Sequence, residues 1–245
     1  MTNKVNKILL EIRAGAGGDE AALFAEDLGK MYKNYCKDQG WSFKVKDYTR
    51  NKEGGFKTLI IKVKGKGVYS ALRHESGVHR VQRVPETESS GRIHTSTASV
   101  AVLPVIKPSK VKINDNDLDV NFFRSSGPGG QNVNKVETAV RITHEPSGIT
   151  VSSQEERSQA RNRERAMAML RGELLEHRRK KKQEKIGSTR KEQIGKAQRA
   201  EKIRTYNFPQ NRITDHRIGK KWKQLERIMD GDMDVVIRAM KKKLD

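Results

Sequence analysis

The residues best suited to chemistry lie in one glycine-rich stretch, residues 124–131, with the sequence Arg-Ser-Ser-Gly-Pro-Gly-Gly-Gln. Gly129 and Gly130 bring no side chains to bury, and they can adopt positive φ, so main-chain N–H groups can closely approach a substrate. The neutral amide of Gln131 cannot act as a general base near pH 7, but it can orient a water molecule or donate to developing negative charge. The stretch predicts chemistry by positioning and electrostatics. The competing interpretation is an ordinary glycine-rich hairpin loop.

The chain around this stretch is strongly basic. Its 245 residues include 51 Lys and Arg against 30 Asp and Glu, which gives a formal net charge of +21 and a pI near 10.1. Such a surplus predicts a polyanionic partner, and nucleic acid is the first candidate. Only 5% of the residues are aromatic, which disfavours single-strand binding by base stacking. Basic and polar side chains beside the glycines suit a phosphate-rich surface: Arg124, Asn132, Asn134 and Lys135.

Several other classes of function receive no support. No apolar run is long enough to span a membrane, and the first residues lack the apolar core of a signal peptide, so we expect no membrane partner and a cytoplasmic location. Cys36 is the single cysteine, and we interpret it as a structural thiol. The histidines lack acids or cysteines at ligand-like spacing, so we expect neither a metal site nor a cofactor.

Hydrophobic periodicity predicts the elements of the first part of the chain. Apolar residues at helical spacing from Phe24 to Tyr35 predict a helix that begins near Asp19 and Glu20 and ends by Gly40. The glycines before it lack the Gly-Lys-Ser/Thr ending of a nucleotide-binding loop, so we reject a nucleoside triphosphate site. A short helix is expected around residues 69–73. Alternating apolar residues predict strands at 8–12, 41–45, 59–63 and 98–102. The element order predicts an α+β fold with an open sheet backed by a helix.

Residues 77–96 are rich in hydrogen-bonding side chains and poor in core formers, and we predict a recognition loop there. The amide of Gln82 and the hydroxyl of Thr87 can both donate and accept, and the ring of His94 can stack on a base. These are the means by which proteins read unpaired RNA bases. A polar surface loop with Pro85 as its turn former is the equally supported alternative.

A second unit comes next along the chain. Strands near residues 111–113 and 118–122 lead into the glycine stretch, and a hairpin is predicted from 139 to 151. We interpret Ser153-Gln-Glu-Glu156 as a capping box that opens a helix. The basic run at 178–182 suits phosphate contact or a solvated helix face, and Gly187 is expected to loosen the segment after it. Residues 206–217 are predicted to be an irregular packed segment, with two closing helices around Gly231.

Together these stretches resemble the bacterial class I peptide chain release factors, in the branch that carries Pro-x-Thr. The resemblance covers nearly the whole chain in collinear order, and it rests on residues 15–24, 79–85, 91–96, 124–131, 204–209 and 214–217. It implies a decoding domain with an open sheet, a small α/β domain that bears Gly-Gly-Gln, and a C-terminal helical segment that packs back on the decoding domain. We place the boundaries at residues 1–108, 109–195 and 196–245.

The resemblance also implies the roles of individual residues. Gly129, Gly130 and Gln131 would promote water attack on the ester of peptidyl-tRNA, with the main-chain N–H of Gln131 stabilising the developing oxyanion. This glutamine is commonly N5-methylated in the family, which implies a glutamine methyltransferase as a partner.

The expected partners are the ribosome with its RNA, the stop codon and peptidyl-tRNA, and we expect a monomer. Pro-x-Thr implies the codons UAA and UAG. The codon positions are expected to be read in order by Gly17 and Glu20, by Thr87 of Pro85-Glu86-Thr87, by His94 between the second and third bases, and by Gln82 and Thr95.

Two departures from the family pattern leave alternatives open. Members usually carry about a domain of helical sequence before the first strand, and this chain begins almost at that strand. The spelling of residues 127–135 is frequent in codon-independent ribosome-rescue hydrolases, which share the catalytic unit but generally lack the recognition domain. A rescue hydrolase is therefore the alternative function. A ribosome-binding protein without hydrolytic activity is a third interpretation, which the intact Gly-Gly-Gln disfavours.

Overall fold

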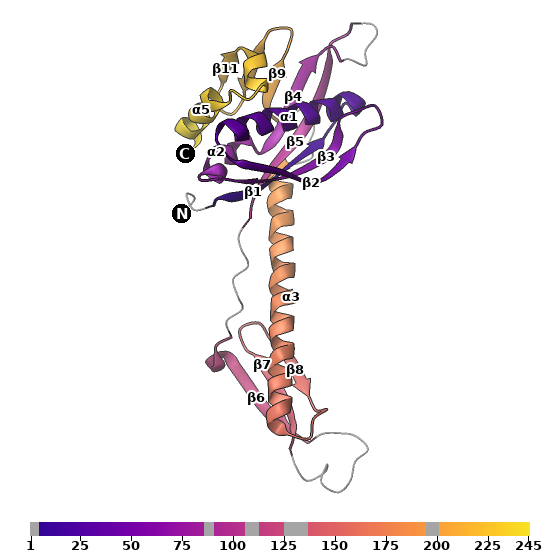
Figure 1. The fold of residues 1–245 in the computed structure, drawn as a ribbon, viewed down its shortest axis with the longest axis vertical. Coiled ribbons are helices and arrows are strands. Elements are labelled where there is room, and N and C mark those ends of the chain that lie inside the picture. The colour runs from indigo at the N-terminus through magenta and orange to yellow at the C-terminus, as the bar shows by residue number, and fades with distance from the viewer. Residues whose placement is uncertain (1–4, 86–90, 106–112, 125–136, 195–200) are drawn as a thin grey trace. The chain divides into compact units, whose positions relative to one another are not determined.

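A computed structural model describes residues 5–85, 91–105, 113–124, 137–194 and 201–245. The chain forms two compact units, one of residues 1–107 with 186–245 and one of residues 108–185 (Figure 1). The glycine stretch from 125 onward, with Gln131, and the pair Glu86 and Thr87 fall outside the described residues. The boundaries that we placed from the sequence stay a prediction.

One open sheet of eight strands organises the larger unit. Its strand order is β11-β10-β9-β4-β5-β1-β3-β2, and all neighbours are antiparallel except β4 and β9. The strands are β1 (Lys7–Ala14), β2 (Ser42–Arg50), β3 (Phe56–Lys64), β4 (Gly77–Arg83), β5 (His94–Pro104), β9 (Lys202–Asn207), β10 (Arg212–Asp215) and β11 (Lys220–Lys223). A large open sheet with packed helices confirms the predicted fold class.

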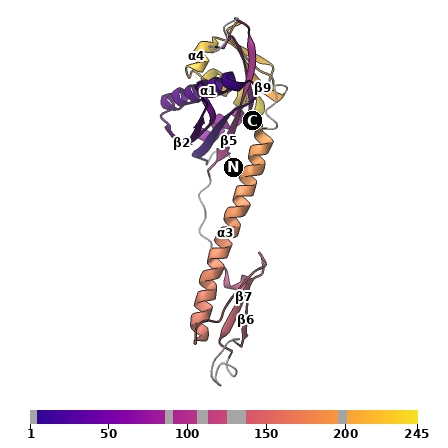
Figure 2. The ribbon, with the colours of Figure 1, turned by 90° about the vertical axis from the view of Figure 1, so that its right-hand side faces the viewer.

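Helix α1 (Gly18–Asp38) packs on β1, β3 and β5, and Figure 2 shows it from the side. Phe24, Leu28 and Tyr35 of this helix are all buried, as their spacing predicts. Cys36 is also buried there, and burial raises the pKa of its thiol to about 12, so the thiol stays protonated and unreactive.

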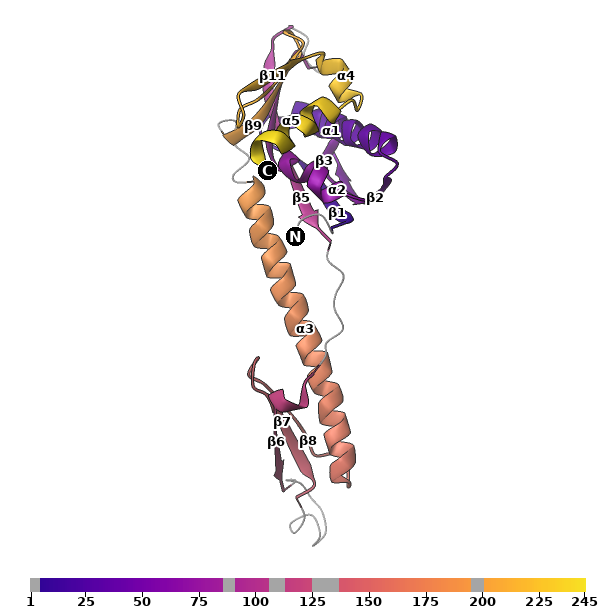
Figure 3. The same cartoon turned by 90° about the vertical axis from the view of Figure 1, so that its left-hand side faces the viewer.

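Shorter helices complete this core. They are α2 (Val68–Leu72), the 3₁₀ turn η2 (Arg73–Glu75), α4 (Leu225–Met229) and α5 (Asp234–Leu244). The predicted short helix and the two closing helices are confirmed. Leu72, Ile228 and Val236 join the same hydrophobic cluster as α1, and Figure 3 shows α2 and α5 side by side. The C-terminal segment therefore packs on the larger unit.

Two predictions about this unit are wrong. In the predicted loop 77–96, residues 77–83 form strand β4 and residues 94–96 begin strand β5. In the predicted irregular segment 206–217, residues 206–207 end strand β9 and residues 212–215 form strand β10. The sequence pattern conceals these strands because His79, Arg204 and Asp215 are buried at 0%, 1% and 0% exposure. Such side chains reach the core by neutralising or hydrogen-bonding partners from other segments, and hydropathy alone cannot show that.

The smaller unit is a three-stranded antiparallel sheet with one helix. Strands β6 (Leu118–Phe123), β7 (Ala139–His144) and β8 (Ile149–Ser153) lie in that order, so the predicted hairpin is confirmed. A 3₁₀ turn, η3 (Asp115–Asp117), precedes β6. Val140, Ile142 and Val151 pack against Ala166 and Leu170 of the helix.

Helix α3 (Gln159–Ile194) corrects two further predictions. The capping box is wrong because the helix begins at Gln159, and Ser153 instead ends β8. Gly187 does not interrupt the helix, which continues to Ile194. The described basic residues 178–181 are exposed on α3. None of the helices in the described part of the chain has the length and apolar character that a membrane span requires.

Candidate nucleic-acid interface

The N-terminal tip of α1 lies directly against β5. Gly17 is the N-cap residue with φ of 129°, and a Cβ atom there would lie 2.2 Å from Oγ of Ser96. Gly15 N donates to the Thr97 carbonyl at 2.8 Å, and Thr97 N donates to the Ala16 carbonyl at 2.8 Å. The tip is therefore held one residue from Thr95. Two of the predicted codon-reading residues, Gly17 and Thr95, are brought together although they are far apart in the sequence.

A glycine substitution tests this close packing. Gly17→Ala is expected to displace the helix tip, because its Cβ would overlap Ser96 and L residues rarely adopt this φ. Gly18→Ala is the matched control, since Gly18 also has positive φ, 61°, but nothing lies within 4 Å of its added Cβ. We expect the codon recognition that the sequence predicts to fall about tenfold or more in Gly17→Ala and much less in Gly18→Ala. Equal losses would show that backbone strain, and not the contact with Ser96, causes the effect.

Glu20 lies in the first turn of α1 and is only 3% exposed. Arg83 at the end of β4 donates from Nε to Glu20 Oε1 at 2.7 Å and from Nη1 to Asp27 Oδ2 at 2.8 Å. Burial alone would lower the pKa of Arg83, but the two carboxylates outweigh burial and raise it. Glu20 Oε2 is buried with no hydrogen-bond partner among the described residues, so it retains an acceptor.

The sheet register places the other predicted residues beside this pair. Gln82 lies opposite Thr95, and Arg83 lies opposite His94, across strands β4 and β5. Asn207 on β9 donates to Gln82 Oε1 at 3.3 Å. His94 is exposed, and Pro85 is buried just after β4. Gly17, Glu20, Gln82, His94 and Thr95 thus share one end of the unit.

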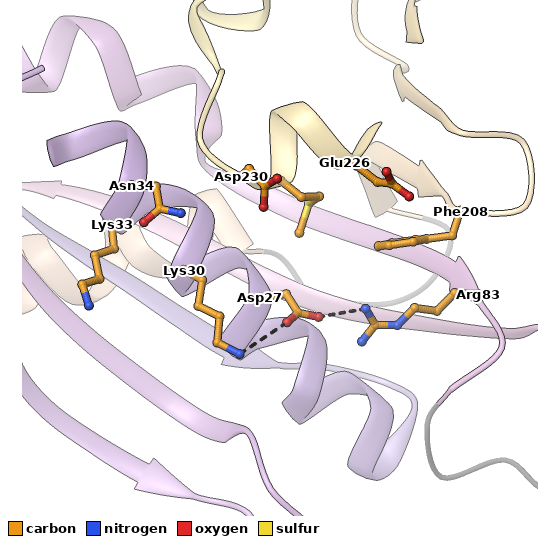
Figure 4. A pocket seen from close by; sticks show the side chains of 9 residues that line it. Asp27, Lys30, Lys33, Asn34, Arg83, Phe208, Glu226 and Asp230 are labelled. Atoms are coloured by element: carbon orange, nitrogen blue, oxygen red, sulfur yellow. Dashed lines mark hydrogen bonds and ion pairs between the residues drawn. The ribbon is translucent and has the colours of Figure 1, made fainter. Parts of the chain in front are cut away.

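A hollow of about 510 Å³ adjoins this end (Figure 4). Arg83 borders it, and its guanidinium lies 5.2 Å from the ring centroid of Phe208. Asp27 and Lys30 of α1 lie on the same side, and Glu226 and Asp230 lie across from them. Positive and negative side chains are balanced along this lining. The hollow itself is therefore not the basic surface that a polyanion needs.

A buried charge network lies in the same sheet. Arg204 donates from Nη1 and Nη2 to the two oxygens of Glu75, at 2.6 and 2.9 Å, and from Nε to Asp215 at 3.2 Å. Burial alone would raise the pKa of Glu75, but Arg204 outweighs it and lowers that pKa. Arg217 donates to Asp215 at 2.7 Å. Arg204, Asp215 and Arg217 come from the stretches that carry the family resemblance, and this network holds β9 and β10 in the sheet.

His79 is completely buried beside this network. Its Nδ1 accepts from the Tyr206 hydroxyl at 3.0 Å and its Nε2 donates to the Glu75 carbonyl at 2.9 Å, which assigns the neutral tautomer. Burial first, and then Arg204, lower its pKa from 6.5 to about 4.

We expect acid to destabilise the larger unit through His79. The unfolded chain takes up a proton near pH 6.5 and the folded chain only near pH 4. Stability is therefore full above pH 6.5 and falls by about 3 kcal/mol between these values. The pKa of His216 is also lowered, so it adds a slope of the same sign. Urea unfolding from pH 4.5 to 7 should show the slope, and His79→Gln should remove most of it. An unchanged slope would contradict the assignment.

The glycine stretch that we predict to be catalytic is described only at its two ends. Strand β6 ends at Phe123 before it, and the chain returns at Glu137 and Thr138 into β7. The carbonyls of these returning residues accept hydrogen bonds from Gln159 and Asn162 of α3, at 2.9 Å each. Sequence reasoning missed Asn162, as it missed Arg83. The sequence carries a signal for its burial, because Asn162 lies four residues before Ala166 and extends the buried stripe of Ala166, Leu170 and Leu174 toward the start of the helix.

Comparison with known proteins gives the family. A model described as the PCRF domain matches residues 2–100, and one described as the RF-1 domain matches residues 106–217. Peptide chain release factor 1 of Thermoanaerobacter pseudethanolicus is 53% identical over 238 residues, which is 97% of this chain and 67% of that protein. The chain belongs to the peptide chain release factor 1 family.

Other release factors agree. Release factor 1 of Carboxydothermus hydrogenoformans is 55% identical, over 97% of this chain and 66% of that protein. The chain therefore spans about two thirds of the length of these release factor 1 relatives. The solved structure of RF2 of Thermus thermophilus matches with a TM-score of 0.59 at 39% identity, and covers 97% of this chain and 68% of that one. Among the described residues, no cluster of His, Cys, Asp or Glu suits a metal ion.

Proposed function

We propose that this chain acts in translation termination. It reads UAA and UAG in the ribosomal A site and promotes hydrolysis of the peptidyl-tRNA ester. The observation that carries the proposal is the convergence of Gly17, at the tip of α1, with Thr95 and Gln82 at the end of β4 and β5. In a member of the release factor 1 family, these are residues expected to read the codon.

The tip of α1 supplies a physical basis for reading the first base. The first N–H groups of a helix have no partner within it, and they are therefore donors at a partly positive end. Uracil, like thymine, presents the acceptor O4, whereas cytosine presents an N4 amino donor at that edge. N–H donors held at Gly17 and Gly18 can pair with O4 of uracil but not with the N4 amino group of cytosine, so they favour uracil. Arg83 keeps Glu20 in place beneath them.

The remaining roles follow the family pattern. Thr87, with Pro85 and Glu86 beside it, reads the second base, His94 stacks between the second and third bases, and Thr95 acts with Gln82 on the third. In the other unit, Gly129, Gly130 and Gln131 act on the ester. The protein works as a monomer on the ribosome in the cytoplasm, and a glutamine methyltransferase modifies Gln131.

Peptide release from ribosomes programmed with different A-site codons tests the proposal. We expect release on UAA and UAG, with at least tenfold less on UGA, on a sense codon and on an empty site. Equal release on every codon, or on an empty site, would instead establish a codon-independent rescue hydrolase. Binding without release on any of them would establish a ribosome-binding protein.

A further inference from the structure

Asn162 of α3 uses its whole hydrogen-bonding capacity in the interior of the smaller unit. It is 0% exposed. Its Nδ2 donates to the carbonyls of Thr138 and Glu156, at 2.9 and 2.8 Å. Its Oδ1 accepts from Ser153 Oγ and from Glu156 N, both at 3.1 Å. Two donors face two carbonyls and an acceptor faces two donors, so only one orientation of the amide satisfies the site.

This amide joins three segments of the chain. They are the end of β8 at Ser153, the connection into α3 at Glu156, and the returning limb of the catalytic loop at Thr138. A buried polar group that is fully satisfied is rigid, because each alternative position leaves an unpaired group in a low-dielectric interior. Thr138 therefore has one position relative to the sheet.

Gln159 holds the residue before it. It is the first residue of α3, three positions before Asn162, so both side chains lie on the same side of the helix. Its Nε2 donates to the Glu137 carbonyl at 2.9 Å. Two consecutive carbonyls, of Glu137 and Thr138, thus receive side-chain amide donors from one helix turn. Gln159 itself is exposed, so it contributes little to the core.

We propose that Gln159 and Asn162 are positioning residues for peptide release, which fix the downstream end of the loop that carries Gln131. The inference rests on the proposed function of that loop. Gln131 lies six residues before Glu137, a stretch that can extend over about 20 Å. Without a fixed end, Gln131 has many more positions available, and a displacement of about 1 Å from the productive geometry can reduce a rate about 100-fold.

Substitutions that keep size and remove the donor test the proposal. Gln159→Glu replaces the exposed amide NH₂ with a carboxylate oxygen that cannot donate to a carbonyl. Asn162→Asp leaves at most one donor, on a protonated carboxyl group, where two carbonyls need one each. We expect kcat for release to fall about tenfold in Gln159→Glu and up to about 100-fold in Asn162→Asp, with unchanged half-saturation by ribosomes. Gln183→Ala is the control for an exposed glutamine of the same helix. Ser153→Ala is the control for Asn162, because it loses a hydrogen bond to that residue but none to the loop.

Amide hydrogen exchange of residues 124–139 gives a readout that does not depend on release. Exchange should accelerate several-fold in Gln159→Glu and remain unchanged in Gln183→Ala. Unchanged exchange and unchanged kcat in Gln159→Glu would overturn the inference. If Ser153→Ala lowers kcat as much as Asn162→Asp does, Asn162 only stabilises the fold. That result would overturn the proposal that Asn162 positions the loop. If the wild-type protein released no peptide, the proposed function would be wrong. Hydrogen exchange would still show whether Gln159 fixes the downstream end of the loop.

Discussion

Gln131→Pro is expected to slow peptide release about 100- to 1000-fold while ribosome binding stays within about twofold. Proline has no backbone N–H, so this substitution removes the donor that we assign to the developing oxyanion. Loss of one oxyanion-hole donor costs a factor of that size in a serine protease. Gln131→Ala keeps the N–H and loses only the amide that orients water, so its release should fall far less, about tenfold.

Single-turnover release at saturating factor, with binding measured separately, distinguishes these outcomes. Val133→Pro is the control for the general effect of a proline in this stretch. It keeps the backbone N–H of Gln131, and the residue whose backbone it restricts is Asn132, not Gln131. If Gln131→Pro and Gln131→Ala slow release equally, the side-chain amide and not the main-chain N–H of Gln131 promotes the reaction. If neither substitution changes the rate of release, residues 124–131 take no part in the reaction.

Arg204→Met is expected to lower the free energy of unfolding of the larger unit by about 3–5 kcal/mol. The substitution leaves Glu75 buried without the cation that neutralises it, while Asp215 keeps Arg217, and an unpaired buried charge is far more costly than a lost contact. Methionine has a similar length, so cavity formation contributes little. Arg204→Lys should restore only part of the loss, since a single ammonium cannot bind both carboxylates in the same way.

The exposed pair Arg227 and Asp232 provides the comparison. Their side chains lie 2.7 Å apart but are 66% and 44% exposed, and Arg227→Met should therefore cost at most about 1 kcal/mol. Urea unfolding of both variants at pH 7 measures the difference. Similar small losses would show that water reaches the Arg204 network.

Elements with a clear apolar period could be predicted from the sequence, and α1 and the hairpin of β7 and β8 are the best examples. Each buries one face of ordinary hydrophobic side chains, which is local information. Strands β4 and β9 could not be predicted, because their buried residues include His79 and Arg204. A charged residue becomes suitable for a core only when a partner from a distant segment neutralises it, and no local pattern reports that partner.

The candidate site divides in the same way. The resemblance predicts roles for Gly17 and Glu20, and the hydrogen-bonding amide of Gln82 predicts its role independently. The structure places these residues near one another at one end of the sheet. Arg83 and Asn162 were not nominated, since their importance lies in the groups that they contact. Arg83 meets an acid on α1, and Asn162 meets a carbonyl before β7. The partners in such contacts follow from the fold, and the four-residue spacing from Asn162 to Leu174 indicates only that Asn162 is buried.

The parallel pairing of β4 with β9 also determines when the eight-stranded sheet can be completed during synthesis of the chain. Residues 108–185 can close their sheet as soon as they emerge, but β4 waits for a strand made after them. Until residue 204 is made, Glu75 has no arginine to neutralise it. A nascent chain that stops before residue 204 therefore keeps an incomplete sheet with an unpaired strand edge and an unneutralised Glu75. Such a chain is expected to be degraded and not to accumulate.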